Sequence, residues 1–538
     1  MDSTYEAFSE EEKKILEHFV TNTEKNIFGL RNLPEVIKGA LFSRYSRSAK
    51  GLRSLLLKEF IQNDDTSFSE IVGHQQDHES QLLAIKKAQN FYDRILDGYG
   101  DDSIGELGGA HLAIENVSML AAKAIEDRRI GGSPLEKSTR YICFDKKVNG
   151  EFLFYKEPVL MTSAYRDLYL NTCNELFETY SRLIEKLTER FQEKFPKEAY
   201  VSSAAYNSAL RAKVLDCLRG LLPASALTNL GMFGNGRFYE KLIQTMQTHN
   251  LSEMQNLGKE IQTELSKIIP SFVRRAENES KYQKAYAQFF DQMQNELQII
   301  TEANAKEIAE RESGVYLVDY DADAVTKVAA GLLFEKSFAS LESLQEYTKN
   351  IPAEEVARIL DAASNSRENR RHKSPRALEL ANYTFEFVAD FGIYRDLQRH
   401  RILTQERQLL TCNYGYYMPL ELMDTDLEQE YVQAMEKAKE AYDIIAKELP
   451  EEAQYVVPMA YKMHWYFHIN LRSLQWLCEL RSSPAGHANY RYIAQEMVRQ
   501  VLKVHPQFES LFKFVDFEGY DLGRMGQEIR KEEKIGKK

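Results

Sequence analysis

The stretch NYTFEFVADFGIYRDLQRHR, residues 382–401, predicts a β-strand that leads directly into a helix. Its aromatic residues Tyr383, Phe385 and Phe387 recur at every second position, as expected for a strand with one face in a core. A helical pattern follows and ends in a basic triplet, residues 399–401. We therefore expect a strand–helix unit with a cationic group at the end of the helix.

Residues 110–129 repeat this plan earlier in the chain. AHLAIENV, residues 110–117, alternates apolar and polar residues, and SMLAAKAIEDRR, residues 118–129, continues as a helical pattern with a basic end. The two basic ends, at Arg128 and His400, are 272 positions apart. A repeated plan of this kind indicates an internal duplication.

A second pair of landmarks supports the duplication. GNGRFYEKL and INLRSLQWL both place Asn-x-Arg before a helical pattern, at Asn235 and Arg237 and again at Asn470 and Arg472. These landmarks are 235 positions apart and occur in the same order as the first pair. The second copy is therefore expected to be more compact between its landmarks.

The predicted fold class is α+β and helix-rich, with two tandem copies of one fold. We place the first copy at residues 1–276, with an N-terminal helical extension, and the second copy at residues 314–538. The Ser-Glu-Glu-Glu sequence before residues 10–20 suits a helix N-terminus. The segment 277–311 is charged and Gln-rich and contains neither Pro nor Gly, so a long exposed helix is expected within a linker, residues 277–313.

Composition limits the function classes. The chain has 538 residues, with 43% hydrophobic and 28% charged residues, as in globular proteins. Its net charge of −12 argues against a general binder of nucleic acid or membrane surfaces. The N-terminus does not resemble a secretory signal, and no apolar run approaches membrane-spanning length. The five cysteines are widely spaced, without CxxC, so the cytoplasm is the expected compartment.

Two stretches carry groups that can hold an anion. In EDRRIGGSPLEKSTRY, residues 126–141, Ser138 and Arg140 can bind a phosphate, and the two glycines allow backbone N–H groups to approach it. In QRHRILTQERQ, residues 398–408, two guanidinium groups and an imidazole suit a phosphate or the anionic atoms of a flavin. The alternatives are a glycine-rich surface loop for the first stretch and a solvated basic helix end for the second.

Together these motifs resemble the flavin-dependent thymidylate synthases, whose hallmark is Arg-His-Arg followed by Glu-x-Ser-x-Arg-Tyr. The second copy has the first part at residues 399–401, and the first copy has the second part at residues 136–141. YGDDSIGEL, residues 99–107, is similar to the family's Gly-His-x-Thr/Ser-x-x-Glu segment, with Asp101 in place of His. The likeness covers roughly residues 30–275 and 315–515, as two divergent copies.

The resemblance implies an enzyme that converts dUMP to dTMP with FAD, methylenetetrahydrofolate as carbon donor and NADPH as reductant. It implies that Arg481 is catalytic and stabilises negative charge on the uracil. The residues it implies for dUMP binding are Glu136, Ser138, Thr139, Arg140, Asp396 and Arg399. The residues it implies for FAD binding are Ser103, Glu106, Arg128, Arg129, Asn235, Arg237, Arg399, His400, Arg401, Asn470, Arg472 and His487.

Neither copy retains the whole family pattern. The first copy has Asp127 in the place of the first Arg of Arg-His-Arg, and it has Asn229 and Met246 at two substrate-arginine positions. In the second copy the departures fall at the Glu, Ser and Arg of the second motif and at the first substrate arginine; the residues found there are Arg407, Leu409, Thr411 and His464. Some of the motif residues that one copy lacks are present in the other, so each copy can supply a different wall of one shared site.

One departure leaves two readings open. In the family, the Glu-x-Ser-x-Arg loop and the uracil-activating arginine belong to the same subunit, whereas here they lie in different copies. Either the site was rearranged on fusion, or Arg481 does another job. Because ordinary members are homotetramers, two chains of this length would supply four family-like units, and we expect a homodimer that mimics the tetramer.

Other chemistries have weaker signals. The pairs His74/His78 and His464/His468 have i,i+4 spacing but lack the HExxH glutamate, so no metal site is expected. None of the five cysteines follows a proline, so a cysteine-based covalent route has no obvious candidate. No GxGxxG or GxxxxGK[ST] motif is found. The alternatives to the synthase are a flavin-dependent transferase acting on another pyrimidine and a degenerate, non-catalytic flavin- or nucleotide-binding protein.

Overall fold

The computed structural model describes residues 8–46, 48–62, 105–304 and 311–536. The chain forms two compact units, each assembled from separate segments. Unit 1 comprises Met1–Glu115, Ala124–Glu136 and Asn229–Ile308, and unit 2 comprises Asn116–Lys123, Lys137–Thr228 and Ala309–Lys538. These units do not coincide with the predicted copies, because residues 137–228 pack with the second copy. The two copies are defined by the repeat in the sequence, whereas the units are defined by packing, and the boundaries of the copies stay a prediction.

The sheet of the first copy has three strands in the order β1-β5-β2, namely Gly109–Ser118, Leu227–Asn235 and Gly132–Glu136. β2 runs antiparallel to β5, from Gly132 opposite Gly234 to Glu136 opposite Leu230. The prediction of a plain loop over residues 126–141 is therefore wrong for its middle part. The glycines serve this pairing: Gly131 has a φ of +89°, and a Cβ on Gly132 would lie 2.4 Å from the Phe238 ring.

The helices of unit 1 precede β1 or follow β5. The N-terminal ones are α1 (Glu10–Leu16), α2 (Glu35–Tyr45), α3 (Leu52–Leu55) and the π-helical turn Leu56–Ile61. Ser9 and Glu12 form a capping box on α1, which confirms the predicted helix start. After β5 come α10 (Gly236–Gln247), α11 (Ser252–Leu265), α12 (Pro270–Val273), the 3-10 turn Arg274–Ala276 and α13 (Lys281–Asn304). α13 buries only Gln283 among its residues, as expected for the exposed helix predicted in this segment.

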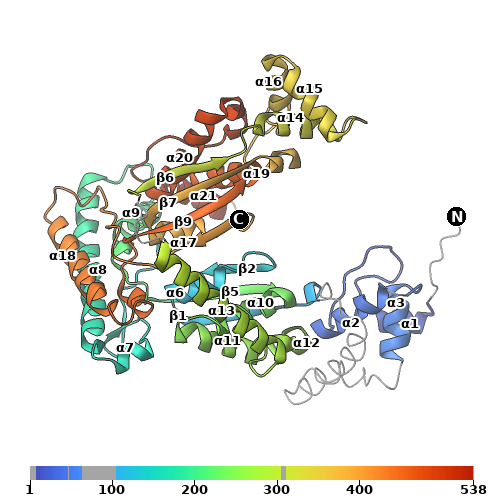
Figure 1. Cartoon of the computed structure of the whole chain (residues 1–538), viewed down its shortest axis with the longest axis horizontal. Helices are drawn as coiled ribbons and strands as arrows, with labels where there is room; N and C mark the ends of the chain where they lie inside the picture. The colour runs from blue at the N-terminus through green and yellow to red at the C-terminus, as the bar shows by residue number, and fades with distance from the viewer. Residues whose placement is uncertain (1–7, 47, 63–104, 305–310, 537–538) are drawn as a thin grey trace. The chain divides into compact units, whose positions relative to one another are not determined.

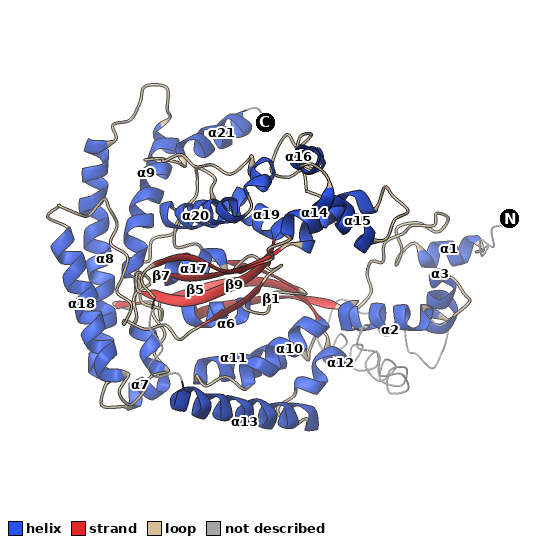
Figure 2. Cartoon of the chain, turned by 45° about the horizontal axis from the view of Figure 1, so that its top comes forward, coloured by secondary structure: helices blue, strands red, loops and turns tan. Residues whose placement is uncertain are grey.

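The sheet of unit 2 has four antiparallel strands in the order β6-β7-β9-β8, shown in red in Figure 2. These are β6 (Gly314–Tyr320), β7 (Asn382–Asp390), β9 (Lys462–Asn470) and β8 (Thr404–Arg407). Tyr383, Phe385 and Phe387 are fully buried on β7, which confirms the strand predicted from their spacing. β7, β9 and β8 repeat the order of β1, β5 and β2, both in the chain and in the sheet. This shared topology supports the internal duplication.

Long helices accompany the sheet of unit 2, where α8 (Arg166–Lys194) packs against both α9 (Ser203–Leu218) and α18 (Glu428–Ile445) (Figure 1). In the chain, α8 and α9 lie between β2 and β5, whereas α18 is the one long helix in the equivalent interval between β8 and β9. This difference accounts for the more compact second copy. The other helices are α6 (Met119–Glu126, which begins in unit 2), α7 (Pro158–Thr162), α14 (Ala324–Phe334), α15 (Leu341–Asn350), α16 (Ala353–Ala362), α17 (Phe391–Leu397), α19 (Leu471–Arg481), α20 (Ala488–Val504) and α21 (Met525–Gly536).

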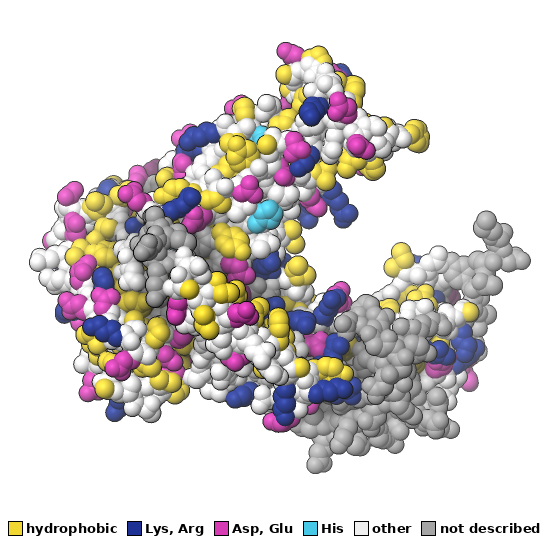
Figure 3. Space-filling model, in the orientation of Figure 1, with side chains coloured by type: hydrophobic (Ala, Val, Ile, Leu, Met, Phe, Trp, Pro, Cys, Tyr) yellow, Lys and Arg dark blue, Asp and Glu magenta, His cyan; other side chains and the backbone are white. Residues whose placement is uncertain are grey.

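Short elements complete unit 2. The hairpin β3–β4 pairs Lys147–Val148 with Glu151–Phe152. The described 3-10 helices of unit 2 are Arg219–Leu221, Arg376–Leu380, Glu452–Val456 and Pro506–Phe512. Among the described helices, none combines the length and the apolar character needed to cross a bilayer. On the face in Figure 3, acidic and basic side chains of the described residues are interspersed.

Equivalent side chains cap the helices that follow equivalent strands. The Ser118 hydroxyl accepts from the Ala121 N–H at 2.9 Å, and the Asp390 carboxylate accepts from the Ile393 N–H at 3.0 Å. Likewise, Asn235 and Asn470 cap α10 and α19, with N–H···Oδ1 distances of 2.8 and 2.9 Å. Ser118 and Asp390 are 272 positions apart, and the two asparagines are 235 apart, matching the sequence landmarks. Capping explains why these positions hold the residue types that they do.

Candidate functional site

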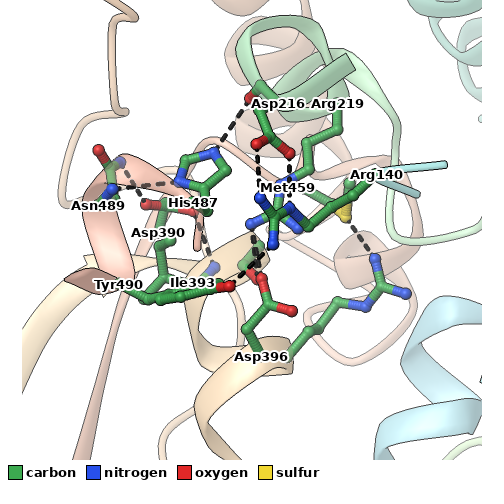
Figure 4. Close-up of polar contacts among 12 residues, drawn as sticks. Arg140, Asp216, Arg219, Asp390, Ile393, Asp396, Met459, His487, Asn489 and Tyr490 are labelled. Carbon is green, nitrogen blue, oxygen red and sulfur yellow. Dashed lines mark hydrogen bonds and ion pairs between the residues drawn. The ribbon is translucent and has the colours of Figure 1, made fainter. Parts of the chain in front are cut away.

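Arg140 lies buried at the centre of a polar network in unit 2 (Figure 4). Its Nε and Nη2 groups donate to the two carboxylate oxygens of Asp216 at 2.6 and 2.7 Å. Nη1 donates to the Tyr490 hydroxyl at 2.8 Å, and Nη2 also donates to the Ala485 carbonyl at 3.2 Å. Because a guanidinium carries five N–H groups, four of them are engaged and one on Nη1 remains for a ligand.

The pairing with Asp216 controls the charge of this network. Burial alone would lower the pKa of Arg140, but the adjacent Asp216 outweighs burial and raises the pKa well above its usual value. Burial alone would raise the pKa of Asp216, but Arg140 holds it below its usual range. Both groups are therefore ionised, and Arg140 is held in place by a charge-assisted, two-point contact.

Asp396, on α17, is the centre of a second cluster of charges. Arg219 donates from Nη2 to Asp396 Oδ2 at 2.8 Å, and both side chains are largely buried. Burial alone would raise the pKa of Asp396, but Arg219, Arg140 and Arg481 together hold it well below its usual range. Asp396 therefore stays ionised and offsets part of the positive charge of the surrounding arginines.

Arg140 and Arg481 come from different copies and contact the same aromatic ring. The guanidinium carbon of each lies 5.4 Å from the centroid of the Tyr490 ring. Burial lowers the pKa of Arg481, although the nearby Asp396 opposes this effect. Within one chain, unit 2 thus brings the second-copy arginine next to the first-copy Ser-x-Arg loop.

Two histidines in this region are neutral, and their hydrogen bonds indicate the tautomers. His400 Nε2 accepts from Arg481 Nε at 2.9 Å, so its proton resides on Nδ1. Burial, reinforced by the charge of Arg481, lowers the pKa of His400 well below its usual value. His487 Nδ1 accepts from the Asn489 N–H at 3.1 Å, so Nε2 donates to the Asp216 carbonyl, also at 3.1 Å. Burial lowers the pKa of His487 to about 4.

A cavity of about 580 Å³ in unit 2, here called the basic cavity, adjoins this network. Its lining combines α19 with the segment after α17 and the segment before β7. The cationic residues that line it are Arg367, Arg370, Lys373, Arg399, Arg401, Arg472 and Arg481. The two lining carboxylates are already paired, Glu479 with Arg367 at 2.6 Å and Glu379 with Arg472 at 2.6 Å. The basic cavity therefore carries an excess of positive charge.

The basic cavity gathers several residues that the sequence implied for FAD or catalysis. Arg399, His400, Arg401, Arg472 and Arg481 all line it. The prediction that the basic triplet lies on the last helical turn is wrong, because α17 ends at Leu397 and the triplet follows it. The triplet precedes the edge strand β8 in the same way that Arg128 and Arg129 precede β2.

The remaining predicted residues divide between the two units. Ser138 and Thr139 lie beside Arg140 in unit 2, where Ser138 Oγ accepts from the Arg140 N–H at 3.3 Å and Thr139 is buried. Asn470 and His487 cap α19 and α20 in the same unit. The predicted residues that belong to unit 1 are Glu106, Arg128, Arg129, Glu136, Asn235 and Arg237. Ser103 lies outside the described residues.

Within unit 1, the predicted residues make contacts among themselves and with α10. Arg237 pairs with Glu106 at 2.8 Å, and both side chains are about half exposed. Arg128 donates to the hydroxyl of Thr245 on α10. Asn235 Oδ1 is occupied by the cap of α10. The roles implied for these residues stay predictions.

Three residues central to the network were not identified from the sequence: Asp216, Arg219 and Tyr490. The first two lie in VLDCLRGLL, residues 214–222, where two charges three positions apart interrupt an apolar run. Such spacing places both charges on one face of a helix that is otherwise buried, which is a detectable signal of a buried ion-pair network. Tyr490 carries no comparable signal.

The histidine pairs give no support to a metal site. His464 and His468 lie on β9, where residues four apart are separated by roughly 13 Å along the strand, not by one helical turn. His464 packs against Tyr414, with ring centroids 4.3 Å apart, and His468 Nδ1 contacts the Thr384 hydroxyl at 2.9 Å. His74 and His78 lie outside the described residues. In the part of the chain that the structure describes, no group of three His, Cys, Asp or Glu residues is placed to hold a metal ion.

Similarity to known proteins extends over most of the chain. A UPF0159 protein of Chlamydia pneumoniae is 54% identical over 98% of this chain and 98% of its own length. A UPF0159 protein of Thermoplasma acidophilum is 32% identical over 93% of this chain and 99% of its own length. A flavin-dependent thymidylate synthase of Clostridium tetani is 28% identical over 32% of this chain and 75% of its own length.

A structural likeness is more limited. The crystal structure of flavin-dependent thymidylate synthase ThyX from Helicobacter pylori, complexed with FAD and dUMP, aligns at 20% identity with a TM-score of 0.29. It covers 38% of this chain and 100% of that chain.

The family described as thymidylate synthase complementing protein matches residues 59–271 and 316–507, one segment in each copy. The chain therefore belongs to the thymidylate synthase complementing protein family, as a double-length member.

Proposed function

We propose that this protein is an FAD-dependent thymidylate synthase that converts dUMP to dTMP, with methylenetetrahydrofolate as carbon donor and NADPH as reductant. The observation that carries the proposal is the convergence of Arg140, from the first copy, and Arg481, from the second, on Tyr490 beside the basic cavity. Family membership supports the reaction class, and the convergence supplies one site made from both copies.

The basic cavity fits a flavin dinucleotide. Its volume of about 580 Å³ falls within the roughly 300–1,000 Å³ of ligand pockets. Its excess of guanidinium groups suits a diphosphate, and Trp476 on its wall offers an aromatic surface. We assign FAD binding to Arg399, His400, Arg401 and Arg472 in this cavity. When bound and reduced, FAD supplies the hydride of the reaction.

The protein's own residues orient the pyrimidine and stabilise its charge. Arg481 is positioned to stabilise the negative charge that develops as the uracil ring is activated. Because His400 occupies the Nε of Arg481, the terminal Nη groups are the ones that meet the substrate. Ser138 and the remaining N–H of Arg140 are assigned to the dUMP phosphate, while Asp396 keeps the arginine cluster from excessive positive charge.

The test is tritium release from 5-tritiated dUMP by purified protein supplied with FAD, methylenetetrahydrofolate and NADPH. We expect flavin absorbance in the purified protein, and tritium release that requires methylenetetrahydrofolate and NADPH and that stops when the flavin is removed. Flavin binding without tritium release in any combination of cofactors would contradict the synthase.

A second candidate is a non-catalytic flavin- or nucleotide-binding protein. The observation that favours it is the near-saturation of Arg140, since four of its five N–H groups already have protein partners. The same assay separates the candidates. Calorimetric binding of dUMP without turnover would favour the non-catalytic protein.

The assembly is proposed to be a homodimer with one FAD site per chain. One basic cavity is described in unit 2, whereas the first-copy arginine Arg237 makes an exposed pair with Glu106. Light scattering should give the mass of a dimer, and absorbance should give about one flavin per chain. Two flavins per chain would contradict the complementary loss of residues between the copies.

A further inference from the structure

The C-terminal segment 516–536, here called the C-terminal cap, lies beyond both regions matched by the family, the second of which ends at residue 507. It consists of a loop followed by α21. Its contacts fall on the elements that hold Arg140 in unit 2. None of its residues is among those that the sequence implied for a site.

The first contact is with the loop 482–487, which supplies the Ala485 carbonyl to Arg140. The backbone N–H of Asp516 donates to the Ser482 hydroxyl at 3.0 Å. Gly523 packs so closely on the same loop that a Cβ added to it would lie 2.0 Å from the Pro484 carbonyl oxygen. The cap can therefore dock here only with glycine at position 523.

The second contact is with the loop that carries Arg140 itself. The guanidinium carbon of Arg524 lies 3.9 Å from the centroid of the Tyr141 ring, a cation–π geometry. Arg524 is only 6% exposed, although Tyr141 is 51% exposed. Arg524 Nη2 pairs with Glu528 Oε1 at 3.5 Å inside the cap, whereas Nε and Nη1 have no hydrogen-bond partner in the described structure. The stack on Tyr141 therefore links Arg524 to the loop that carries Arg140.

The third set of contacts is with the helices α20 and α9. Arg491 on α20 donates to Asp516 Oδ1 at 3.1 Å and to the Glu518 carbonyl at 2.9 Å. α21 packs against α9, and the Ser202 hydroxyl at the start of α9 donates to Glu532 at 2.6 Å. α20 carries Tyr490 and α9 carries Asp216, the other two partners of Arg140.

The C-terminal cap thus contacts all four elements that position Arg140, namely the Arg140 loop, the loop 482–487, α9 and α20. We infer that the cap positions the Arg140 loop for substrate, with Arg524 as a positioning residue acting through Tyr141. The substrate part of this inference rests on the proposed function, in which Arg140 meets the phosphate of dUMP. Because displacement of an orienting group by about 1 Å can weaken a site strongly, loosening the cap weakens dUMP binding without touching the flavin.

The experiment compares two glycines of the cap, each changed to alanine. Gly523→Ala adds a Cβ against the Pro484 carbonyl, whereas Gly519→Ala adds the same atom where nothing lies within 4 Å. Arg524→Ala removes the stack, together with the pair to Glu528 inside the cap, without a clash. Hydrogen exchange of residues 137–142 is measured by mass spectrometry in the absence of ligand, and dUMP affinity by calorimetry with FAD bound.

We expect faster exchange of residues 137–142 in Gly523→Ala and Arg524→Ala, and wild-type exchange in Gly519→Ala. We expect dUMP affinity to fall roughly 2- to 30-fold in Arg524→Ala, because losing the cation–π contact loosens the loop that carries Arg140. Flavin content should stay at the wild-type level. Tyr141→Phe keeps the ring and is expected to behave as wild type, whereas Tyr141→Ala should match Arg524→Ala.

The outcomes separate this inference from the proposed function. Unchanged exchange of residues 137–142 in both Gly523→Ala and Arg524→Ala would overturn the positioning role, whatever the enzyme does. Faster exchange with unchanged dUMP affinity would also overturn it, because the cap would then be merely structural. If the wild-type protein binds no dUMP, the proposed function fails, and the exchange data alone decide whether the cap holds the loop.

Discussion

Asn235 and Asn470 occupy equivalent strand–helix junctions, yet the arginine two residues after each meets a different environment. Arg237 pairs at 2.8 Å with Glu106, and both side chains are about half exposed. Arg472 is 29% exposed and donates to the Ser374 carbonyl and to Glu379 on the wall of the basic cavity. An exposed ion pair contributes little to stability, whereas Arg472 lies on the wall of the cavity in which we propose that FAD binds. Both copies thus keep the capped strand–helix junction, while the surroundings of the arginine that follows it differ.

The first copy contributes to the site in another way. Arg140, Asp216 and Arg219 all come from residues 137–228, and they meet Asp396, Arg481 and Tyr490 of the second copy in unit 2. One copy thus lends a polar wall to the other, rather than building a separate site from the same parts. Four sets of variants test this contrast.

Arg481→Ala should lower turnover more than any of the other changes. The equivalent residue of the first copy is Met246, which is buried on α10, so only the second copy places a charge at this position. Loss of an electrostatic stabiliser typically lowers turnover by roughly 100- to 1,000-fold, and we expect this loss in tritium release at saturating FAD. Met246→Leu serves as the control and should keep nearly full activity. A loss of less than about fivefold in Arg481→Ala would show that another group stabilises the charge.

The next effect concerns the helix caps Ser118 and Asp390. Burial raises the pKa of Asp390 to about 6, so its protonated form stabilises the fold below about pH 4, and this contribution is lost as the pH rises through 6. Asp390→Ser gives the second copy the cap of the first. Between pH 4 and pH 7 we expect the wild type to lose up to about 3 kcal/mol relative to the variant.

Thermal unfolding of both proteins at pH 4, 5, 6 and 7 measures this difference. Asp396 does not interfere in this window, because its pKa is depressed and it titrates at lower pH. Parallel pH profiles for the wild type and Asp390→Ser would contradict the assignment of a raised pKa to the Asp390 carboxyl.

A third test compares Arg472→Ala with Arg237→Ala. Loss of a charge-assisted hydrogen bond weakens binding by roughly 1.5–3 kcal/mol, so Arg472→Ala should lower FAD affinity by about 10- to 100-fold. Arg237→Ala should leave it unchanged, because its pair with Glu106 is exposed. Flavin fluorescence titration of apoprotein gives both affinities. Equal losses in the two variants would show that both copies hold flavin.

The smallest effects are expected where the copies are most alike. Asn235→Ala and Asn470→Ala each remove one cap hydrogen bond, at 2.8 and 2.9 Å, and should destabilise the protein by about 1 kcal/mol each. The corresponding changes to Ser keep a capping oxygen and serve as controls. Thermal unfolding midpoints check this prediction. A clearly larger effect at Asn470 would mean that its side chain does more than cap a helix.

Local patterns were predictable from the sequence, while long-range partners were not. The alternation of Tyr383, Phe385 and Phe387 and the Asn-x-Arg repeats correctly indicated strands and helix starts, because these depend on neighbours within a few residues. The edge strand β2 was missed because its pairing with β5 joins residues about 100 positions apart. The contact of Arg140 with Tyr490 spans 350 positions, and no local periodicity carries information about it.

The chain passes between the two units five times, and this path has a consequence for synthesis on the ribosome. Residues 220–225 form backbone hydrogen bonds with residues 455–460, including Ala224 N–H to Val457 O at 2.8 Å and Met459 N–H to Leu222 O at 2.9 Å. A nascent chain must therefore hold α8 and α9 without α18 until its last quarter emerges, with apolar side chains exposed meanwhile. Chaperone dependence is expected for the nascent chain, and the two halves made separately should be recovered in soluble form only when they are produced together.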